Sequence, residues 1–388
     1  MRYWRGYLTA GILAVLTMGL TTLAKRFSQL VDAFYPFLTR EIQTTLAAWS
    51  ATVDITVWQV AVMLILLGLL LSVVIMVALK WNFFQWLGWV LAGASLIWLL
   101  HTGIYGLNYY AGPLSEDVHL DSHDFTVEDL ADATIYFRDK ANAMALEMSR
   151  DEKGNLIFSD FDTLAQKAGD GFHHLTYEAS GSVFAGSLEP VKELAWADLY
   201  TSMGITGITM PLTGEAAVNP QTPAVSMPFT MCHEMAHRMC IATEHDANFA
   251  AFLACLSNED PQFRYSAYYM AYRYCYSALL SAGTAEAAAA AARIDLEVNS
   301  YLRYDLKTYD RFFSSRRNEA ASAVADAVND AYIKVSGDSA GTDSYGQVAT
   351  DLVNWYIDVM VMPYVDEREE SGFDPLDKDY INGILGNG

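Results

Sequence analysis

One short segment of the chain carries the residue types that bind a metal ion and activate water. His233, Glu234 and His237 form the pattern His-Glu-Met-Ala-His. Positions i and i+4 of a helix share one face, so a helix here brings both imidazoles within reach of one zinc ion. Glu234 lies beside them and can take a proton from a metal-bound water. The segment predicts a zinc-dependent hydrolytic site, with His233 and His237 as metal ligands and Glu234 as the catalytic base.

Catalytic zinc sites usually take three protein ligands and a water, so a third ligand is expected near this segment. Glu244 follows His237 by seven residues, and its carboxylate is the favoured choice. Asp246 and His245 are the alternatives, and His245 would give a three-histidine site. Asn248 stands four residues after Glu244, on the same face of a helix, and is expected to support that ligand from behind.

A peptidase mechanism follows from this chemistry. The metal lowers the pKa of its water and polarises a substrate carbonyl, while Glu234 removes the proton and delivers it to the leaving amine. The segment at 214–219 precedes the metal helix and is the candidate strand for binding an extended peptide. Tyr345 is the candidate for stabilising the oxyanion. The alternative function is a membrane-bound sensor or peptide-binding scaffold that keeps a zinc site without turnover.

A difference in composition divides the chain into two parts. The 388 residues are 53% hydrophobic and 18% charged, with a net charge of -22. Residues 1–104 hold six basic and three acidic residues, so nearly all of the negative charge lies downstream. A soluble chain usually carries about 25% charged residues, and nucleic-acid binding needs a basic face. The composition favours a membrane protein with an acidic domain and excludes a nucleic-acid partner.

Three stretches lack Asp, Glu, Lys and Arg, at 6–24, 55–79 and 81–115. Each is long enough to cross the hydrocarbon core of a lipid bilayer. Because they hold no acidic or basic residue, they are expected to anchor the protein in the cell membrane rather than to form a transport path. A cleaved signal peptide is the alternative for the first stretch. The first basic residue after the third stretch is Arg138, which favours an extracytoplasmic location for the part that follows.

The rest of the chain is predicted to be mainly helical with a small sheet. Residues 203–219 combine β-branched residues with Gly and Pro, which indicates strand and turn. We expect a membrane anchor of three transmembrane helices at 1–112, a mainly α, α+β domain at 113–366 and a poorly ordered tail at 367–388. The helices after the anchor are expected near 126–149, 229–241, 245–257, 261–281, 284–298, 316–335 and 346–361.

The pairing of HExxH with a downstream ExxAN resembles the gluzincin metallopeptidases, especially the integral-membrane, prenyl-protease-like type. The ligand helix of that type reads ExxAD, and Asn248 stands here in place of its Asp. The metzincin pattern fails, because Cys240 and Thr243 replace its Gly and its last His. A closer resemblance is to an uncharacterised bacterial family of three-span membrane proteins with a zinc-metallopeptidase domain. It implies a zincin-like fold and a zinc site, and it supplies no substrate. The matching stretches are GLNYYAGPL (106–114), GITGITMPLTGEAAVN (204–219), PFTMCHEMAH (228–237), EHDANFAAFLAC (244–255) and AYIKVSGDSAGTDSYGQV (331–348).

Overall fold

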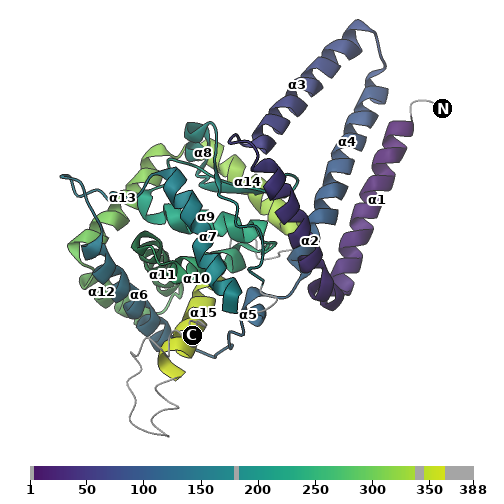
Figure 1. Cartoon of the computed structure of the whole chain (residues 1–388). Helices are drawn as coiled ribbons and strands as arrows, with labels where there is room; N and C mark the ends of the chain where they lie inside the picture. Colours follow the sequence, from purple (N-terminus) through teal and green to yellow (C-terminus); the bar gives the residue numbers. More distant parts are fainter. Residues whose placement is uncertain (1–3, 179–182, 337–344, 363–388) are drawn as a thin grey trace.

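Three long apolar helices extend away from the rest of the molecule (Figure 1). The computed structural model describes residues 4–178, 183–336 and 345–362. The helices α1 (Arg5–Arg26), α3 (Val57–Ala78) and α4 (Phe83–Ile104) are each long and apolar enough to cross a membrane. The three predicted spans are thereby confirmed as candidates. The third is shorter than its uncharged stretch, because α4 gives way to the 3-10 turn η1 (Gly106–Tyr110).

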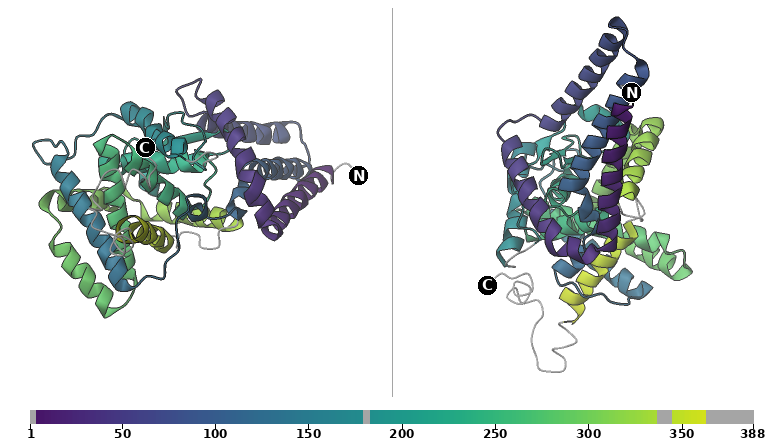
Figure 2. Two further views of the ribbon diagram at one scale, coloured as in Figure 1. Left: turned by 60° about the horizontal axis from the view of Figure 1, so that its bottom comes forward. Right: turned by 90° about the vertical axis from the view of Figure 1, so that its right-hand side faces the viewer.

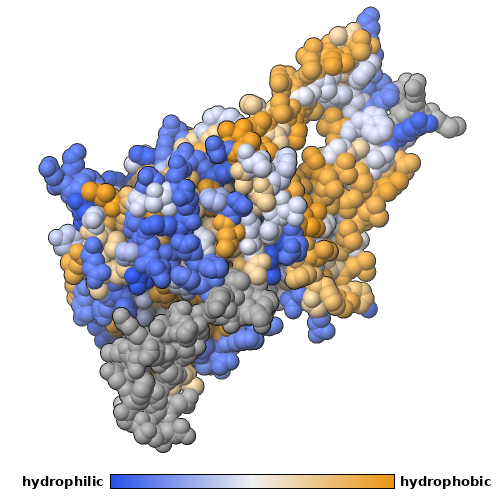
Figure 3. Space-filling view, in the orientation of Figure 1, coloured by the Kyte–Doolittle hydropathy of each residue, from blue (hydrophilic) through white to orange (hydrophobic). Residues whose placement is uncertain are grey.

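Small residues set the packing of two of these helices. Gly6 and Ala10 of α1, and Gly88 and Ala92 of α4, are buried. A Cβ atom added to Gly6 would lie 2.5 Å from the backbone of Gly88, so the two helices approach closely. Such contacts are typical of helices in a bilayer, where apolar burial alone does not drive association. Figure 3 shows the apolar surface of the long helices beside the more polar surface of the remaining structure.

A fourth helix, α2 (Ser28–Ser50), lies between the three candidate membrane helices and the remaining structure, and it was not among the predicted elements. The left view of Figure 2 shows it between these two parts. Arg40 Nε donates to the carbonyl of Met239 at 3.2 Å, and Gln43 Nε2 donates to that of Pro211 at 3.0 Å. The anchor is therefore bonded to the domain by side chains of α2 as well as by the continuous chain.

The part of the chain after η1 is mostly helical, as predicted. Thr126 begins α6 with a capping box, since its hydroxyl accepts from the Asp129 amide and the Asp129 carboxylate accepts from the Thr126 amide. Four helices, α5, α7, α8 and α13, lie where none was predicted. The helices are α5 (Leu114–Asp117), α6 (Val127–Glu147), α7 (Phe161–Glu178), α8 (Ala197–Met203), α9 (Met227–Arg238), α10 (Glu244–Ser257), α11 (Pro261–Ser281), α12 (Ala285–Leu296), α13 (Ser300–Arg316), α14 (Glu319–Ser336) and α15 (Tyr345–Tyr356), with a π-helical turn η4 (Ile357–Val361).

A three-stranded sheet covers one side of the helix α9. Its strands are β1 (Lys192–Glu193), β2 (Gly207–Met210) and β3 (Glu215–Val218), in the order β1-β3-β2. The segment predicted to be strand and turn forms an antiparallel hairpin of β2 and β3, with Ile208 opposite Ala217, and β1 lies parallel to β3. The central place of β3 corrects one expectation. The segment 214–219 cannot bind a peptide by strand addition, because β3 already has a partner strand on each side.

The sheet is also bonded to α3, one of the three candidate membrane helices. The two carboxylate oxygens of Glu215 accept hydrogen bonds from the amides of Val57 and Trp58, each at 2.8 Å. These amides have no partner within α3, so Glu215 caps that helix from the domain. Lys192 pairs with the same carboxylate at 2.8 Å and neutralises it in a buried setting. The membrane helix and the sheet beside α9 thus form one hydrogen-bonded structure.

Candidate functional site

The structure brings His233, His237 and Glu244 together. The two histidines share one face of α9, and their Nε2 atoms lie 3.1 Å apart. Glu244 begins the next helix, where its carboxylate oxygens lie 3.4 Å from His233 Nε2 and 3.7 Å from His237 Nε2. One ligand atom from each of the three residues lies within 4.8 Å of the others. Two imidazole nitrogens and one carboxylate oxygen make the donor set of many catalytic zinc sites.

A tight turn between α9 and α10 produces this convergence. Cys240 has a positive φ of 70°, and the amide of Ile241 bonds back to the carbonyl of Ala236 at 3.1 Å. Thr243 then caps α10, with its side chain accepting from the Asp246 amide. The chain reverses within a few residues, so the first turn of α10 lies against the last turn of α9.

The two alternative ligands lie in a separate group. His245 and Asp246 come together with Asp351 of α15, again with one ligand atom each within 4.8 Å. Asp246 is also engaged structurally, since its carboxylate accepts from the Thr243 hydroxyl at 2.6 Å and from the Leu114 amide at 3.1 Å. The structure therefore places Asp246 and His245 apart from the pair of histidines on α9, although all four residues are close in sequence.

The histidines are held in unequal ways. The Nδ1 atom of His237 lies 2.9 Å from the carbonyl of Ile241, a contact that fixes the orientation of its ring. The Nδ1 atom of His233 is buried and has no hydrogen-bond partner among the described residues. Burial alone would lower the pKa of His237, but the Glu244 and Glu234 carboxylates outweigh it and raise this pKa to about 9. Two anions at this position make the site suited to a cation.

Glu234 is positioned by the strand β2. It is 5% exposed, and its carboxylate accepts a hydrogen bond from Thr209 Oγ1 at 2.7 Å. A Cβ atom on Gly207 would overlap Glu234 Oε1, so only glycine leaves room for this side chain. Burial raises the pKa of Glu234 above its usual value, against the opposing effects of both histidines and Thr209. A raised carboxyl pKa is a property expected of a general base.

A cavity of about 390 Å³ opens beside the cluster, lined by His233 and Glu244 together with Asn248 and Tyr274. The Tyr274 hydroxyl donates to Asn248 Oδ1 at 3.0 Å. Asn248, predicted to support Glu244 from behind, has this partner on α11 and a place in the cavity wall. The side chain of Tyr345, the expected oxyanion residue, lies outside the described residues.

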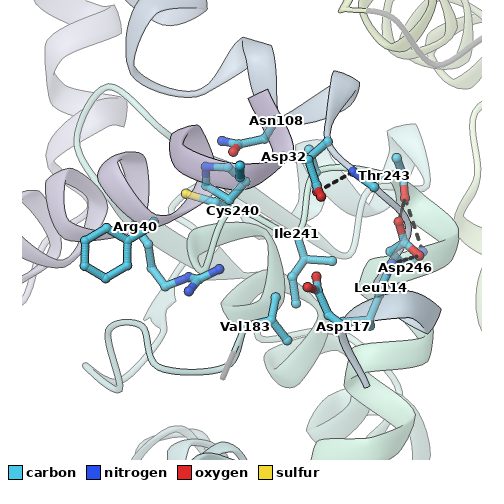
Figure 4. Close-up of a pocket in the computed structure, with 16 residues that line it drawn as sticks. Asp32, Arg40, Asn108, Leu114, Asp117, Val183, Cys240, Ile241, Thr243 and Asp246 are labelled. Carbon is cyan, nitrogen blue, oxygen red and sulfur yellow. Dashed lines mark hydrogen bonds between the residues drawn. The ribbon is translucent and has the colours of Figure 1, made fainter. Parts of the chain in front are cut away.

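A second cavity, of about 320 Å³, lies where the anchor meets the domain. Figure 4 shows Arg40 from α2 and Asp117 from α5 at its wall, with Asp246 from the start of α10. Burial raises the pKa of Asp117, and the carboxylates of Asp32 and Asp246 add to this effect. This cavity contains none of the three residues of the histidine cluster.

A family model described as Protein of unknown function (DUF3810) matches residues 31–353. The chain belongs to this family. The match runs from α2 to α15 and includes the whole histidine cluster and both cavities. No curated protein and no solved structure matches the chain. For this DUF3810 protein, the geometry of the site is therefore the basis of any functional conclusion.

Several residues of the DUF3810 site carry no local signal in the sequence. Gly207 and Thr209 contact Glu234 from a strand well upstream, and a hairpin pattern does not reveal what its side chains touch. Arg273 and Tyr274 lie in a tyrosine-rich helix whose pattern is typical of a packed face, yet both line the cavity. The fold brings the surrounding residues to the site from distant parts of the chain, whereas the spacing of His233 and His237 is visible in the sequence.

Proposed function

We propose that this protein is a membrane-anchored zinc metallopeptidase with a zincin-like domain. The observation that carries the proposal is the convergence of His233, His237 and Glu244 in one cluster beside a cavity, with the buried carboxylate of Glu234 on the same helix as the histidines. These residues would hold zinc as its three protein ligands, leaving a further position open. The donor set fits zinc better than calcium or magnesium, which prefer oxygen ligands alone.

The chemistry divides between the metal and the chain. A bound zinc ion supplies an acidified water and polarises the substrate carbonyl. Glu234 accepts a proton from the attacking water and passes it to the amine nitrogen as the peptide C–N bond breaks. Thr209 and Gly207 keep its carboxylate in place. The Tyr274 hydroxyl, which lines the same cavity, is the donor we assign to the developing oxyanion in place of Tyr345. Its one proton would turn from Asn248 Oδ1 to the oxyanion.

The sheet provides a place for an extended peptide. β2 lies at the edge of the sheet, next to Glu234, whereas β3 is enclosed. An edge strand presents unpaired amide and carbonyl groups that a peptide backbone can join. Thr206, immediately before β2, lines the same cavity as His233 and Glu244. The proposed substrate is therefore a peptide that lies along β2 with its scissile bond at the cluster.

The test uses the full-length protein in detergent, because α2 and α3 are bonded to the domain. Wild type should hold about one zinc per chain and hydrolyse a pool of unstructured peptides, with loss of both after chelation. The His233→Ala/His237→Ala double variant should lose the zinc. Glu234→Gln should keep it while hydrolysis falls by about a thousandfold, with the exposed Glu259→Gln as the matched control. Zinc-free wild type, or a Glu234→Gln variant as active as wild type, would refute the proposal.

One observation favours the alternative of a sensor or scaffold. Glu215 of β3 caps the start of α3. β3 pairs with β2, and Thr209 of β2 donates a hydrogen bond to Glu234. A movement of α3 in the bilayer would therefore reach the zinc cluster through the sheet. In that case wild type would bind zinc and peptide but hydrolyse none, and the Glu234→Gln variant would bind peptide as tightly as wild type.

We further propose that the domain faces the extracytoplasmic side of the cell membrane. A single thiol at an exposed turn, Lys153→Cys, should react with an impermeant maleimide on intact cells. A thiol at the turn between α3 and α4, Lys80→Cys, should react only after lysis. The four native cysteines are buried and leave little background. The reverse pattern of labelling would place the domain in the cytoplasm.

A further inference from the structure

The cavity beside the histidine cluster contains one cationic side chain that the proposed mechanism does not use. Its charged lining residues are His233, Glu244 and Arg273. The first two are committed to the metal. Arg273 of α11 is therefore the remaining charge that a substrate meets in the described wall of this cavity.

Its neighbours hold the Arg273 guanidinium in place. It stacks over the ring of Tyr309 of α13, 4.3 Å from the centroid, and lies 5.9 Å from that of Tyr269. Its Nη1 donates to Asp310 at 3.0 Å, and the Asp310 side chain is 65% exposed. An ion pair with so exposed a partner is weak, and a guanidinium has five N–H donors. The side chain is oriented in advance and retains donors for a second anion.

The neighbouring residues of α11 connect Arg273 to the site. Tyr274 follows it directly and bonds to Asn248, which shares a helical face with Glu244. Ser277, one turn further along α11, adds a hydroxyl group to the same cavity wall. A group bound by Arg273 would therefore belong to the substrate whose scissile bond lies at the histidine cluster.

We propose that Arg273 binds a carboxylate of the peptide substrate and makes the site selective for peptides that carry one near the scissile bond. The inference rests on the proposed function, because it takes the cavity as the place of the peptide. Arginine forms paired, charge-assisted hydrogen bonds with carboxylates. The net charge of -22 does not attract anionic peptides from a distance. The preference must therefore come from this local contact.

The carboxylate has two sources, an acidic side chain or the free C-terminus of a short peptide. The probes are fluorescein-labelled alanine hexapeptides with Glu or Gln at each position in turn, each made as the C-terminal acid and as the amide. Binding is measured by anisotropy to full-length, zinc-loaded Glu234→Gln protein, which holds peptide without turnover. We expect about tenfold tighter binding for Glu over Gln at one position, or for the acid over the amide. The first result identifies a side chain and the second a C-terminus.

Further variants in the Glu234→Gln background separate Arg273 from the metal, which also attracts carboxylates. Arg273→Gln should abolish the discrimination while zinc content stays the same. Arg273→Lys should retain part of it, and the exposed Arg264→Gln on the same helix should retain all of it. The inference is overturned if no carboxylate strengthens binding, or if Arg273→Gln discriminates as before. Failure of the proposed function shows separately, as absence of zinc-dependent hydrolysis by wild type.

Discussion

The histidine cavity and the junction cavity are both lined by the start of α10, but they place its carboxylates in opposite electrostatic surroundings. The start of α10 lies between them, with Glu244 in the wall of the histidine cavity and Asp246 in that of the junction cavity. A helix turns about 100° per residue, so side chains two residues apart point to nearly opposite sides. A single helical start can therefore supply a ligand to one cavity and a structural acceptor to the other.

The partners decide what each carboxylate does. Burial alone would raise the pKa of Glu244, but His233 and His237 outweigh it and hold the pKa well below its usual value. In the junction cavity burial raises the pKa of Asp117, and neighbouring carboxylates raise it further. A carboxylate beside imidazoles stays ionised and can bind a metal ion. A buried carboxylate beside other carboxylates holds its proton more tightly, because its pKa is raised. The comparison explains why spacing alone left three candidates for the third ligand.

Exchanging carboxylate for amide on each side of this helical start should give opposite results. Glu244→Gln removes a charged ligand, so zinc affinity should fall by at least about tenfold, together with hydrolysis. Asp246→Asn weakens the acceptor of the Thr243 hydroxyl and the Leu114 amide, so it should lower stability by about 1 kcal/mol and leave zinc bound. Zinc content and melting temperature of both variants measure the contrast.

His245→Ala is the matched control, since His245 belongs to the same group as Asp246. It should keep its zinc. If Asp246→Asn or His245→Ala loses the metal while Glu244→Gln retains it, the third ligand belongs to the other group, and the assignment of roles to the two cavities is reversed.

Patterns of neighbouring residues predicted those elements whose formation depends on interactions close along the chain. The absence of charge marked α1, α3 and α4, and the spacing of His233 and His237 placed both rings on one face of α9. The β-branched and glycine-containing segment at 203–219 formed a hairpin. In each case the sequence determines the structure through neighbouring residues along the chain.

Long-range contacts explain what the sequence did not reveal. α2 holds the buried polar residues Arg40 and Gln43, whose partners Met239 and Pro211 lie far along the chain, so its amphipathic pattern is hard to recognise. The strand at 214–219 carried the signal for extended structure but not its central place in the sheet. The choice between Glu244 and Asp246 depended on the turn at Cys240, which no local pattern specifies.

A smaller effect is expected from the residue that leaves room for Glu234. Gly207→Ala places a methyl group against the Glu234 carboxylate and must displace it. Hydrolysis should fall by about tenfold to a hundredfold, because a general base acts only within hydrogen-bond reach, while zinc content is unchanged. Gly346→Ala, whose added Cβ meets nothing within 4 Å, is the matched control. Equal activity of the two variants would show that Glu234 is not confined by β2.

A different kind of effect, on the pH dependence of stability, is expected for Asp351, in the group that lacks a second imidazole. Burial raises the pKa of Asp351 to about 7, and the charge of Asp246 adds to the shift. Between about pH 4 and pH 7 the folded chain holds a proton that the unfolded chain has lost, so this group's contribution to stability falls as pH rises through that range. Asp351→Asn removes the titration. Its stability relative to wild type should therefore increase by about 2 kcal/mol from pH 5 to pH 8, as measured by denaturant unfolding of both proteins. A stability difference that does not change with pH would contradict the raised pKa of Asp351. It would mean that a cation already neutralises the carboxylates in the group of His245, Asp246 and Asp351, as expected for the histidine cluster.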